Sequence, residues 1–242
     1  MNHNYLSLFP EYENETVSNI KIEKSHEIWV RKKSRNFGME HCSNAFFQGK
    51  YGIPQIKKYT GPIPDKLITL DKVNNIGSNT TGITTFVFDY ILDDVADNPE
   101  KYQDKFSRYA FIAEPDFSMK VTDPLSLVIA NTLRSHSTAF YYQEHGCKVM
   151  PVMKWSTNDS YEVCFDGYEK GGVVMLSTIG VLRDERSHFY FKNGIKEMLR
   201  IIAPEAIILY GDINEWIMGI FPDQLDIHHF NHERFNRMRN GR

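Results

Sequence analysis

The sequence has few cysteines and no long apolar run. Its three cysteines, Cys42, Cys147 and Cys164, form no CxxC pair, so neither a disulfide framework nor a zinc ribbon is predicted. No window approaches the roughly 18 consecutive apolar residues that a membrane span requires. The N-terminus also lacks a basic region followed by an apolar core. These absences predict a cytoplasmic protein with no membrane partner.

An excess of either charge is also missing. Lysine and arginine total 28 against 31 aspartates and glutamates, so the formal net charge of the 242 residues is -3. This balance gives no global basic field of the kind that marks a nucleic-acid-binding protein, and any such binding has to be local. Hydrophobic residues make up 41% of the chain and aromatic residues 13%, which is enough for a substantial core and argues against disorder.

Several catalytic signatures are absent as well. The sequence contains no GxxxxGK[ST] phosphate loop, no GxGxxG after a strand, no GxSxG elbow, no HExxH helix and no CxxxCxxC cluster. Each of these motifs holds a phosphate, a nucleophile or a metal by a known geometry. Their absence disfavours P-loop nucleotidases, dinucleotide oxidoreductases, serine hydrolases and radical-type iron–sulfur enzymes.

What the sequence does contain is an alternation of short apolar runs with helix-like segments from Thr80 onward. We expect strands within residues 83–90, 109–113, 147–155, 172–181 and 206–212, and helices within 98–108, 123–146 and 191–204. Such βαβ units predict an α/β fold with a mainly parallel sheet of about five or more strands and crossover helices. The sheet is either doubly wound and open or an incomplete or TIM-like barrel, and we favour the barrel.

The chain is expected to form one domain with two additions. Residues 1–60 are an irregular N-terminal extension packed on the core, 61–220 form the α/β core, and 221–242 form a basic tail rich in His and Arg. The helix after the second strand has the clearest signals: Asp123 is expected to cap it, Pro124 to open it and Gly146 to close it.

Polar residues follow each of the predicted strands. They are Asp89; Asp116 and Ser118; Trp155; Ser177 and Thr178; and Tyr210 and Asp212. In parallel α/β folds the carboxyl ends of the strands share one face, which is where ligands bind, so these residues are expected to converge. The alternative is that they form turns and helix caps, for which Asp and Ser are equally suited.

If they converge, Asp116, assisted by Asp89 and Asp212, can act in one of two ways. Three carboxylates can hold a divalent cation such as magnesium, or they can supply a general acid and base for hydrolysis or glycosyl transfer. Trp155 and Tyr210 suit stacking on a sugar or a base, although Trp155 is also read as a core aromatic. We therefore predict a nucleotide-like or sugar-containing ligand, with further contacts from Ser118, Asn131, Arg134 as anion anchor, Ser177 and Thr178.

A competing hypothesis is a non-catalytic protein that binds nucleic acid or a host or phage protein. It depends on the basic stretch after Phe230, where Arg234, Arg237 and Arg239 are the candidate contacts to a phosphate backbone. In that case the polar strand ends are ordinary turns.

The succession "FVFDY", "EPDFSM", "VMPVMKW" and "LYGD" resembles the uncharacterised domain-of-unknown-function family numbered 4417, found in bacteria, phages and plasmids. The resemblance covers roughly residues 54–212. It departs from the family's usual Ser and Tyr at Glu114 and Lys120. It implies a phage or mobile-element protein and names no reaction. The positions that match are Asp89, Asp116, Ser118, Asn131, Arg134, Trp155, Ser177, Gly180, Tyr210 and Gly211.

Overall fold

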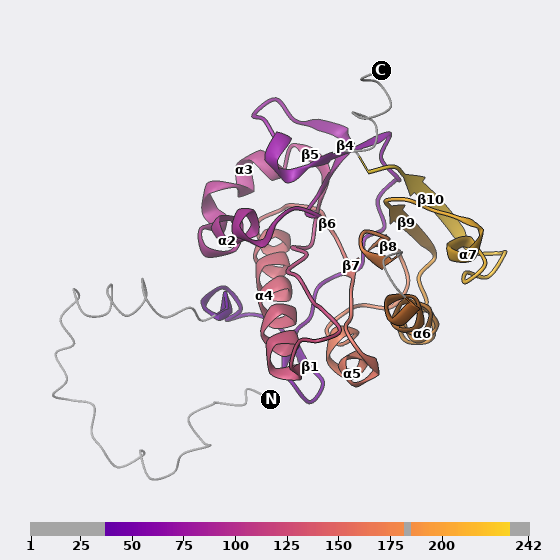
Figure 1. Cartoon of the computed structure of the whole chain (residues 1–242). Coiled ribbons are helices and arrows are strands. Elements are labelled where there is room, and N and C mark those ends of the chain that lie inside the picture. Colours follow the sequence, from indigo (N-terminus) through magenta and orange to yellow (C-terminus); the bar gives the residue numbers. More distant parts are fainter. Residues whose placement is uncertain (1–36, 182–184, 233–242) are drawn as a thin grey trace, which may run out of the picture. The chain divides into compact units, whose positions relative to one another are not determined.

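A computed structural model describes residues 37–181 and 185–232 of the chain (Figure 1). Its centre consists of parallel strands in two four-stranded sheets. The first sheet contains β3 (Lys66–Thr69), β4 (Ser78–Thr84), β5 (Tyr109–Ala113) and β6 (Val149–Met150), in that order. The second contains β7 (Val152–Met153), β8 (Val173–Ser177), β9 (Ala206–Tyr210) and β10 (Asp226–Phe230). A two-stranded antiparallel ladder pairs β1 (Phe47–Gln48) with β2 (Ile53–Pro54).

One extended segment joins the two sheets, because only Pro151 separates β6 from β7. Proline has no N–H to donate, so the ladder is interrupted there, although its carbonyl still accepts from Met175 N at 2.8 Å. Neighbouring strands follow chain order throughout, as in a TIM-like barrel. No ladder joins β3 to β10 within the residues described, so the barrel is not closed. The predicted parallel α/β class is confirmed.

Both faces of the strands are buried. Along β8, Val174 and Leu176 belong to the core that the helices cover, whereas Val173 and Met175 belong to a second apolar cluster formed mainly by strand residues. The period of two places alternate side chains in each cluster. All residues of β5 and β9 are buried, which explains why these strands appear in the sequence as continuous apolar runs.

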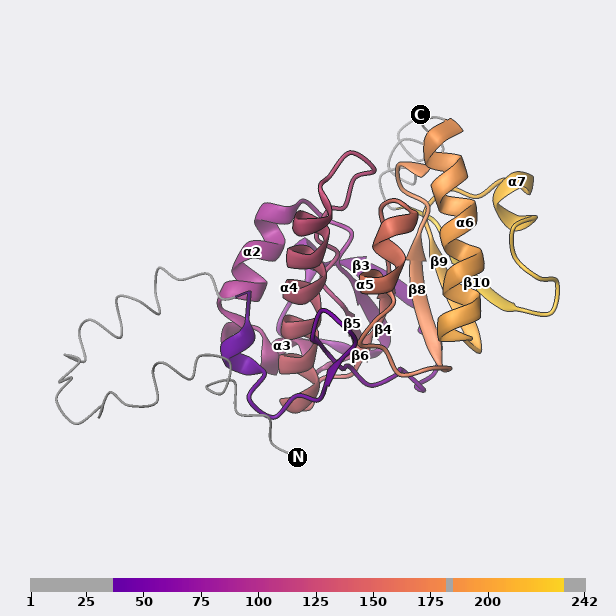
Figure 2. The ribbon, with the colours of Figure 1, turned by 90° about the horizontal axis from the view of Figure 1, so that it is seen from below.

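The helices follow the strands in sequence. Figures 1 and 2 show α4 beside β5 and β6, and α6 beside β8 and β9. The α-helices are α2 (Asp89–Asp97), α3 (Gln103–Phe106), α4 (Leu125–Glu144), α5 (Tyr161–Cys164), α6 (Glu185–Ile202) and α7 (Glu215–Met218). Short 3-10 turns are η4 (Met39–His41), η5 (Leu70–Lys72), η6 (Pro99–Lys101) and η7 (Asn158–Ser160). None of the helices in the described part of the chain has the length and apolarity needed to cross a membrane.

Three local expectations are corrected. The strand expected at 83–90 ends at Thr84, and the side-chain hydroxyl of the next residue, Thr85, donates to the carbonyl oxygen of Glu114 at 2.6 Å. Asp89 therefore opens α2, where a negative charge suits the helix N-terminus. Asp123 does not cap α4: its carboxylate accepts from Lys120 N at 2.7 Å and closes a turn instead.

The C-terminal stretch contains a strand that the sequence pattern did not predict. β10, with the sequence DIHHF, pairs in parallel with all five residues of β9. Its two histidines interrupt the apolar pattern. His229 Nε2 lies 2.7 Å from the carbonyl oxygen of Gly211, so this polar ring has a hydrogen-bond partner beside the sheet. At the other end of the described chain, Ile53 and Ile56 are fully buried, so the segment before residue 60 contributes to the core.

Candidate functional site

A pocket of about 870 Å³ lies where the parallel strands end. Six strands contribute a residue from their carboxyl ends or from the segments that follow them, which brings together positions far apart in sequence. In chain order these are Asp71, Phe86, Asp116, Lys154, Ser177 and Tyr210. The carboxyl-end face of the sheets therefore contains a cavity large enough for a small-molecule ligand.

Asp116 is one of the two carboxylates that line this pocket. Its side chain is 29% exposed, and its Oδ1 lies 3.9 Å from Lys154 Nζ. Burial raises the pKa of Asp116 to about 6, and the nearby charges of Glu114 and Asp89 act in the same direction. The Lys154 ammonium opposes this shift by favouring the ionised form. The carboxyl group is thus able to exchange a proton close to neutral pH.

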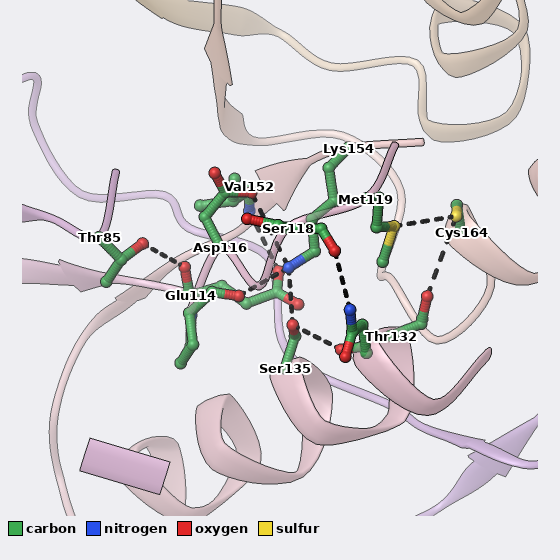
Figure 3. A network of polar contacts seen from close by, with 12 residues as sticks. Thr85, Glu114, Asp116, Ser118, Met119, Thr132, Ser135, Val152, Lys154 and Cys164 are labelled. Carbon is green, nitrogen blue, oxygen red and sulfur yellow. Dashed lines mark hydrogen bonds and ion pairs between the residues drawn. The ribbon is translucent and has the colours of Figure 1, made fainter. Parts of the chain in front are cut away.

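Lys154 holds the strand end that carries Asp116. Its Nζ donates to the carbonyl oxygen of Pro115 at 2.7 Å and to the hydroxyl of Ser135 at 2.6 Å, and its side chain is only 11% exposed. Figure 3 shows Lys154 between the Asp116 loop and α4. Asp116 adds an ion pair at 3.9 Å to these two hydrogen bonds. The geometry indicates that Lys154 is a fixed cation. It positions Asp116 and favours the ionised form of the carboxyl group.

The loop after β5 is held from two helices. The Asp89 carboxylate accepts from Ser118 Oγ at 2.9 Å and from Ser118 N at 3.2 Å. Asn131 Nδ2 donates to the carbonyl oxygen of Ser118 at 2.8 Å. Ser118 lines the pocket, whereas Asp89 and Asn131 do not. Asp89 and Asn131 are therefore placed as supports of the loop through Ser118, and the charge of Asp89 also acts on Asp116.

Arg134 lies in a different cluster. Its guanidinium pairs with Asp93 at 2.7 Å and Asp97 at 3.0 Å, and it lies 4.1 Å from the centre of the Phe117 ring. The side chain is 12% exposed and does not line the pocket. Its two ion pairs connect α4 to α2, so the structure places Arg134 as a brace between helices.

The segments that follow β8 and β9 are joined by a hydrogen bond. Ser177 Oγ accepts from Ile179 N at 3.1 Å, and Thr178 Oγ1 donates to the carbonyl oxygen of Asp212 at 2.7 Å. Of these, Ser177 and Ile179 line the pocket, whereas Thr178 and Asp212 do not. Asp212 is thereby absent from the group around Asp116. Across residues 37–181 and 185–232, no group of three or more His, Cys, Asp or Glu side chains is arranged to hold a metal ion.

Aromatic rings form two walls of the pocket. Trp155 Nε1 donates to the carbonyl oxygen of Tyr190 at 2.9 Å, and its ring stacks on Phe191 with centroids 5.9 Å apart. On another side Tyr210 stacks on Phe86 with centroids 5.1 Å apart. All five residues involved, Trp155, Tyr190, Phe191, Phe86 and Tyr210, line the pocket. Trp155, which follows β7, and Tyr210, the last residue of β9, thus both line the pocket, although Tyr210 is only 2% exposed.

Four charged residues that line the pocket were not among the predicted site residues: Asp71, Lys72, Lys120 and Lys154. Lys154 directly precedes Trp155 and interrupts the apolar run "VMPVM", which is a signal that a strand-end search can use. Asp71 lies in the short turn η5 after β3, a strand that the sequence analysis did not predict. Asp71 and Asp116 are the carboxylates among the residues that line the pocket. The arginines Arg234, Arg237 and Arg239 lie outside the described residues.

Comparison with known proteins finds one matching family and two similar phage proteins. The family model named Domain of unknown function (DUF4417) matches residues 45–229, which run from before β1 to the end region of β10. The Gene 1 protein of Mycobacterium phage L5 is 28% identical over 128 residues, which are 53% of this chain and 56% of the phage protein. The Gene 1 protein of Mycobacterium phage D29 is 29% identical over 126 residues, 52% of this chain and 47% of that protein.

The chain therefore spans about half the length of the curated relatives it matches. No solved structure matches it.

Proposed function

This chain belongs to the family called Domain of unknown function (DUF4417), as its sequence motifs predicted, and we propose that its pocket binds and processes a nucleotide-like or sugar-containing ligand. Its curated relatives are phage proteins, in keeping with the resemblance described above. The observation that carries the proposal is the position of Asp116: a partly exposed carboxyl group with a pKa raised to about 6, beside a fixed ammonium and facing an 870 Å³ pocket.

The proposed chemistry is hydrolysis or glycosyl transfer with Asp116 as the acid/base group. A carboxyl group that titrates near pH 6 both donates and accepts protons efficiently at neutral pH, because a catalytic pKa close to the operating pH maximises the useful population. Lys154 keeps the group oriented. Asp71 is the second pocket carboxylate, and we assign it the supporting role that the sequence analysis gave to Asp89 and Asp212.

The ligand class follows from the walls of the pocket. Trp155 and Tyr210 line the pocket, and aromatic rings suit contact with the flat ring of a base or the apolar face of a sugar. Lys72 and Lys120 also line the pocket and suit an anionic group such as a phosphate. The volume falls within the range of roughly 300–1,000 Å³ that is usual for small-molecule sites. These properties together support a ligand with a ring and a negative charge.

The test is a thermal-shift screen of the full chain against nucleotides, nucleosides, sugars and sugar phosphates, with Asp116→Asn and Asp104→Asn in parallel. Asp104 lies in α3, which precedes β5, and it is absent from the pocket, so it is a matched carboxylate control. A ligand at about 100 times its Kd stabilises the protein by roughly 2.7 kcal/mol.

We expect one ligand class to raise the Tm of the parent and of Asp104→Asn equally, and that of Asp116→Asn by less. The proposal is wrong if no compound in the screen shifts the Tm, or if the two variants respond alike.

A further inference from the structure

One side of the pocket lies at the open seam of the incomplete barrel, where no ladder joins β3 to β10 within the described residues. This seam side is formed by Asp71 in the turn after β3, Phe86 after β4 and Tyr210 at the end of β9, which all line the pocket. The rings of Phe86 and Tyr210 stack with centroids 5.1 Å apart. Side chains therefore bring the first and second sheets together on the seam side.

Asp71 supplies the carboxylate of the seam side. The residue is exposed, and no hydrogen bond or ion pair to another residue of the described chain holds its side chain. An ionised carboxylate accepts hydrogen bonds through two oxygens and donates none. The two oxygens can take two donors of one ligand at once, and bonds to a charged acceptor are stronger than bonds to a neutral one. Asp71 is thus suited to a ligand group that presents paired donors.

Two buried hydroxyl groups adjoin the seam side. Tyr210 is 2% exposed, and Thr84, the last residue of β4, is fully buried. Burial raises the pKa of the Tyr210 hydroxyl, the neighbouring Thr84 hydroxyl opposes that shift, and the charge of Asp71 adds to it. Neither hydroxyl has a hydrogen-bond partner among the described residues, and an unpaired buried hydroxyl is costly. The polar groups on this side therefore have hydrogen-bonding capacity that the described residues leave unused.

We propose that the seam side is a sugar subsite, in which Asp71 accepts hydrogen bonds from two adjacent hydroxyl groups of the ligand. This inference rests on the proposed function, and it specifies the sugar part of the ligand as a vicinal diol such as that of ribose. Adjacent hydroxyls on one face of a sugar ring present two donors, which match two carboxylate oxygens. In dinucleotide-binding folds an acidic residue likewise binds a ribose hydroxyl. The supporting role of Asp71 is then a binding role, and Asp116 remains the proton-transfer group.

Other roles for the Asp71 carboxylate make different predictions. A divalent cation needs several oxygen ligands, and the part of the chain that the structure describes contains no group of three or more His, Cys, Asp or Glu side chains arranged to hold one. A purely structural role is to stabilise the start of η5, where a negative charge is favourable. Neither a structural role nor an ion pair with a ligand amine distinguishes ligands by their hydroxyl groups.

The experiment measures the Kd of the full chain by isothermal titration calorimetry for ligand pairs that differ by one hydroxyl group. The first set pairs the nucleoside monophosphates of the common bases with their 2′-deoxy forms, and the second pairs methyl mannoside with its 2-deoxy form. The variants are Asp71→Ala and Asp71→Asn, with Asp65→Ala as the control. Asp65 directly precedes β3, is exposed and does not line the pocket. The Tm of each protein is measured in parallel.

We expect the parent to bind at least one ribonucleotide about tenfold more tightly than its deoxy form, because the missing hydroxyl removes a hydrogen bond to a charged group. Asp71→Ala should lose this preference, so that the two forms bind within about twofold of each other. Asp71→Asn keeps one acceptor oxygen and should show an intermediate preference. Asp65→Ala should keep the preference of the parent, and every variant should have a Tm close to that of the parent.

The outcomes separate this inference from the proposed function. If the parent binds a ribonucleotide and its deoxy form equally, or if Asp71→Ala keeps the preference, the sugar subsite is wrong and the pocket proposal stands. If only the mannoside pair shows the preference and Asp71→Ala loses it, the subsite is supported with a free sugar as the source of the diol. If the parent binds neither a nucleotide nor a glycoside, the subsite and the proposed function are both wrong.

Discussion

The carboxylate of Glu114 and the imidazole of His136 face each other inside the core, with Oε1 3.6 Å from Nε2 and both side chains fully buried. Glu114 Oε2 accepts from Val152 N at 3.1 Å and from the Tyr168 hydroxyl at 2.8 Å. His136 Nδ1 lies 2.9 Å from the carbonyl oxygen of Pro54, which can only accept, so Nδ1 carries a proton. Within the described residues, Glu114 Oε1 and His136 Nε2 have no hydrogen-bond partner.

This pair fixes the junction between the two sheets. Glu114 directly follows β5, and the Val152 N–H that it binds belongs to β7, just after the proline that interrupts the ladder. Burial lowers the pKa of His136, and the charge of Glu114 partly opposes that effect. The pocket residue Asp116 therefore lies two residues along the chain from a buried polar network.

Replacing Glu114 with alanine should destabilise the protein by about 3–5 kcal/mol. The change removes the acceptor of the buried Val152 N–H and one of the two acceptors of the Tyr168 hydroxyl, and it takes away the carboxylate that faces His136; a buried donor is costly when unpaired. Glu114→Gln keeps one acceptor oxygen and adds a donor toward His136, so its loss should be smaller. Urea unfolding measures both. If Glu114→Ala and the parent unfolded at the same urea concentration, the hydrogen bonds of Glu114 would not contribute to stability as proposed.

The ionisation of Asp116 should make the protein less stable as pH rises. Its folded pKa, about 6, lies above the unfolded value, so the folded state binds more protons between these two pKa values. The contribution of Asp116 to the free energy of unfolding is then most favourable below about pH 4. It falls by roughly 3 kcal/mol as the pH rises past about 6. Unfolding of parent and Asp116→Asn across pH 4–7.5 isolates the effect.

The parent should lose stability relative to Asp116→Asn over this interval. A constant difference between the two proteins from pH 4 to 7.5 would show that the pKa of Asp116 is not raised in the folded state.

Arg134→Ala should lower stability without changing ligand affinity. The guanidinium bridges α4 to Asp93 and Asp97 of α2, and hydrogen bonds between charged groups contribute about 1.5–3 kcal/mol when poorly exposed. We expect a loss of about 2 kcal/mol in chemical unfolding. The Kd of any ligand found for the pocket should stay within about twofold, because Arg134 does not line it. A selective loss of an anionic ligand would restore Arg134 to the role of anion anchor.

Gly194→Ala should destabilise the protein, whereas the same change at an open helix position stabilises it. At an open position in a helix, this change stabilises by about 0.5–1 kcal/mol, because alanine loses less backbone entropy. A Cβ at Gly194 would lie 2.0 Å from Cε2 of Trp155, so α6 or the indole has to shift. We expect destabilisation of about 1–3 kcal/mol together with weaker ligand binding, since Trp155 is a wall of the pocket. A more stable Gly194→Ala protein would show that the indole is free to move.

Much of the fold was predictable from local pattern. Parallel strands buried on both faces require continuous apolar runs, and "YAFIA" and "AIILY" are such runs. The strand β10 was missed because its DIHHF sequence has the composition of a surface segment, and its histidine His229 becomes compatible with the sheet only through the carbonyl of Gly211. That partner lies 18 residues away and has no local signature.

The sequence by itself determined the α/β class, the family and the face on which a ligand site is expected, because these depend on the order of apolar and polar segments. Only the tertiary structure decided which polar strand-end residues reach the pocket. Asp116 and Lys154 do, whereas Asp89 binds Ser118, 29 residues away, and Arg134 binds Asp93, 41 residues away. Whether a polar residue at a strand end lines the pocket depends on where its partners from distant segments hold it, and only the fold brings those partners there.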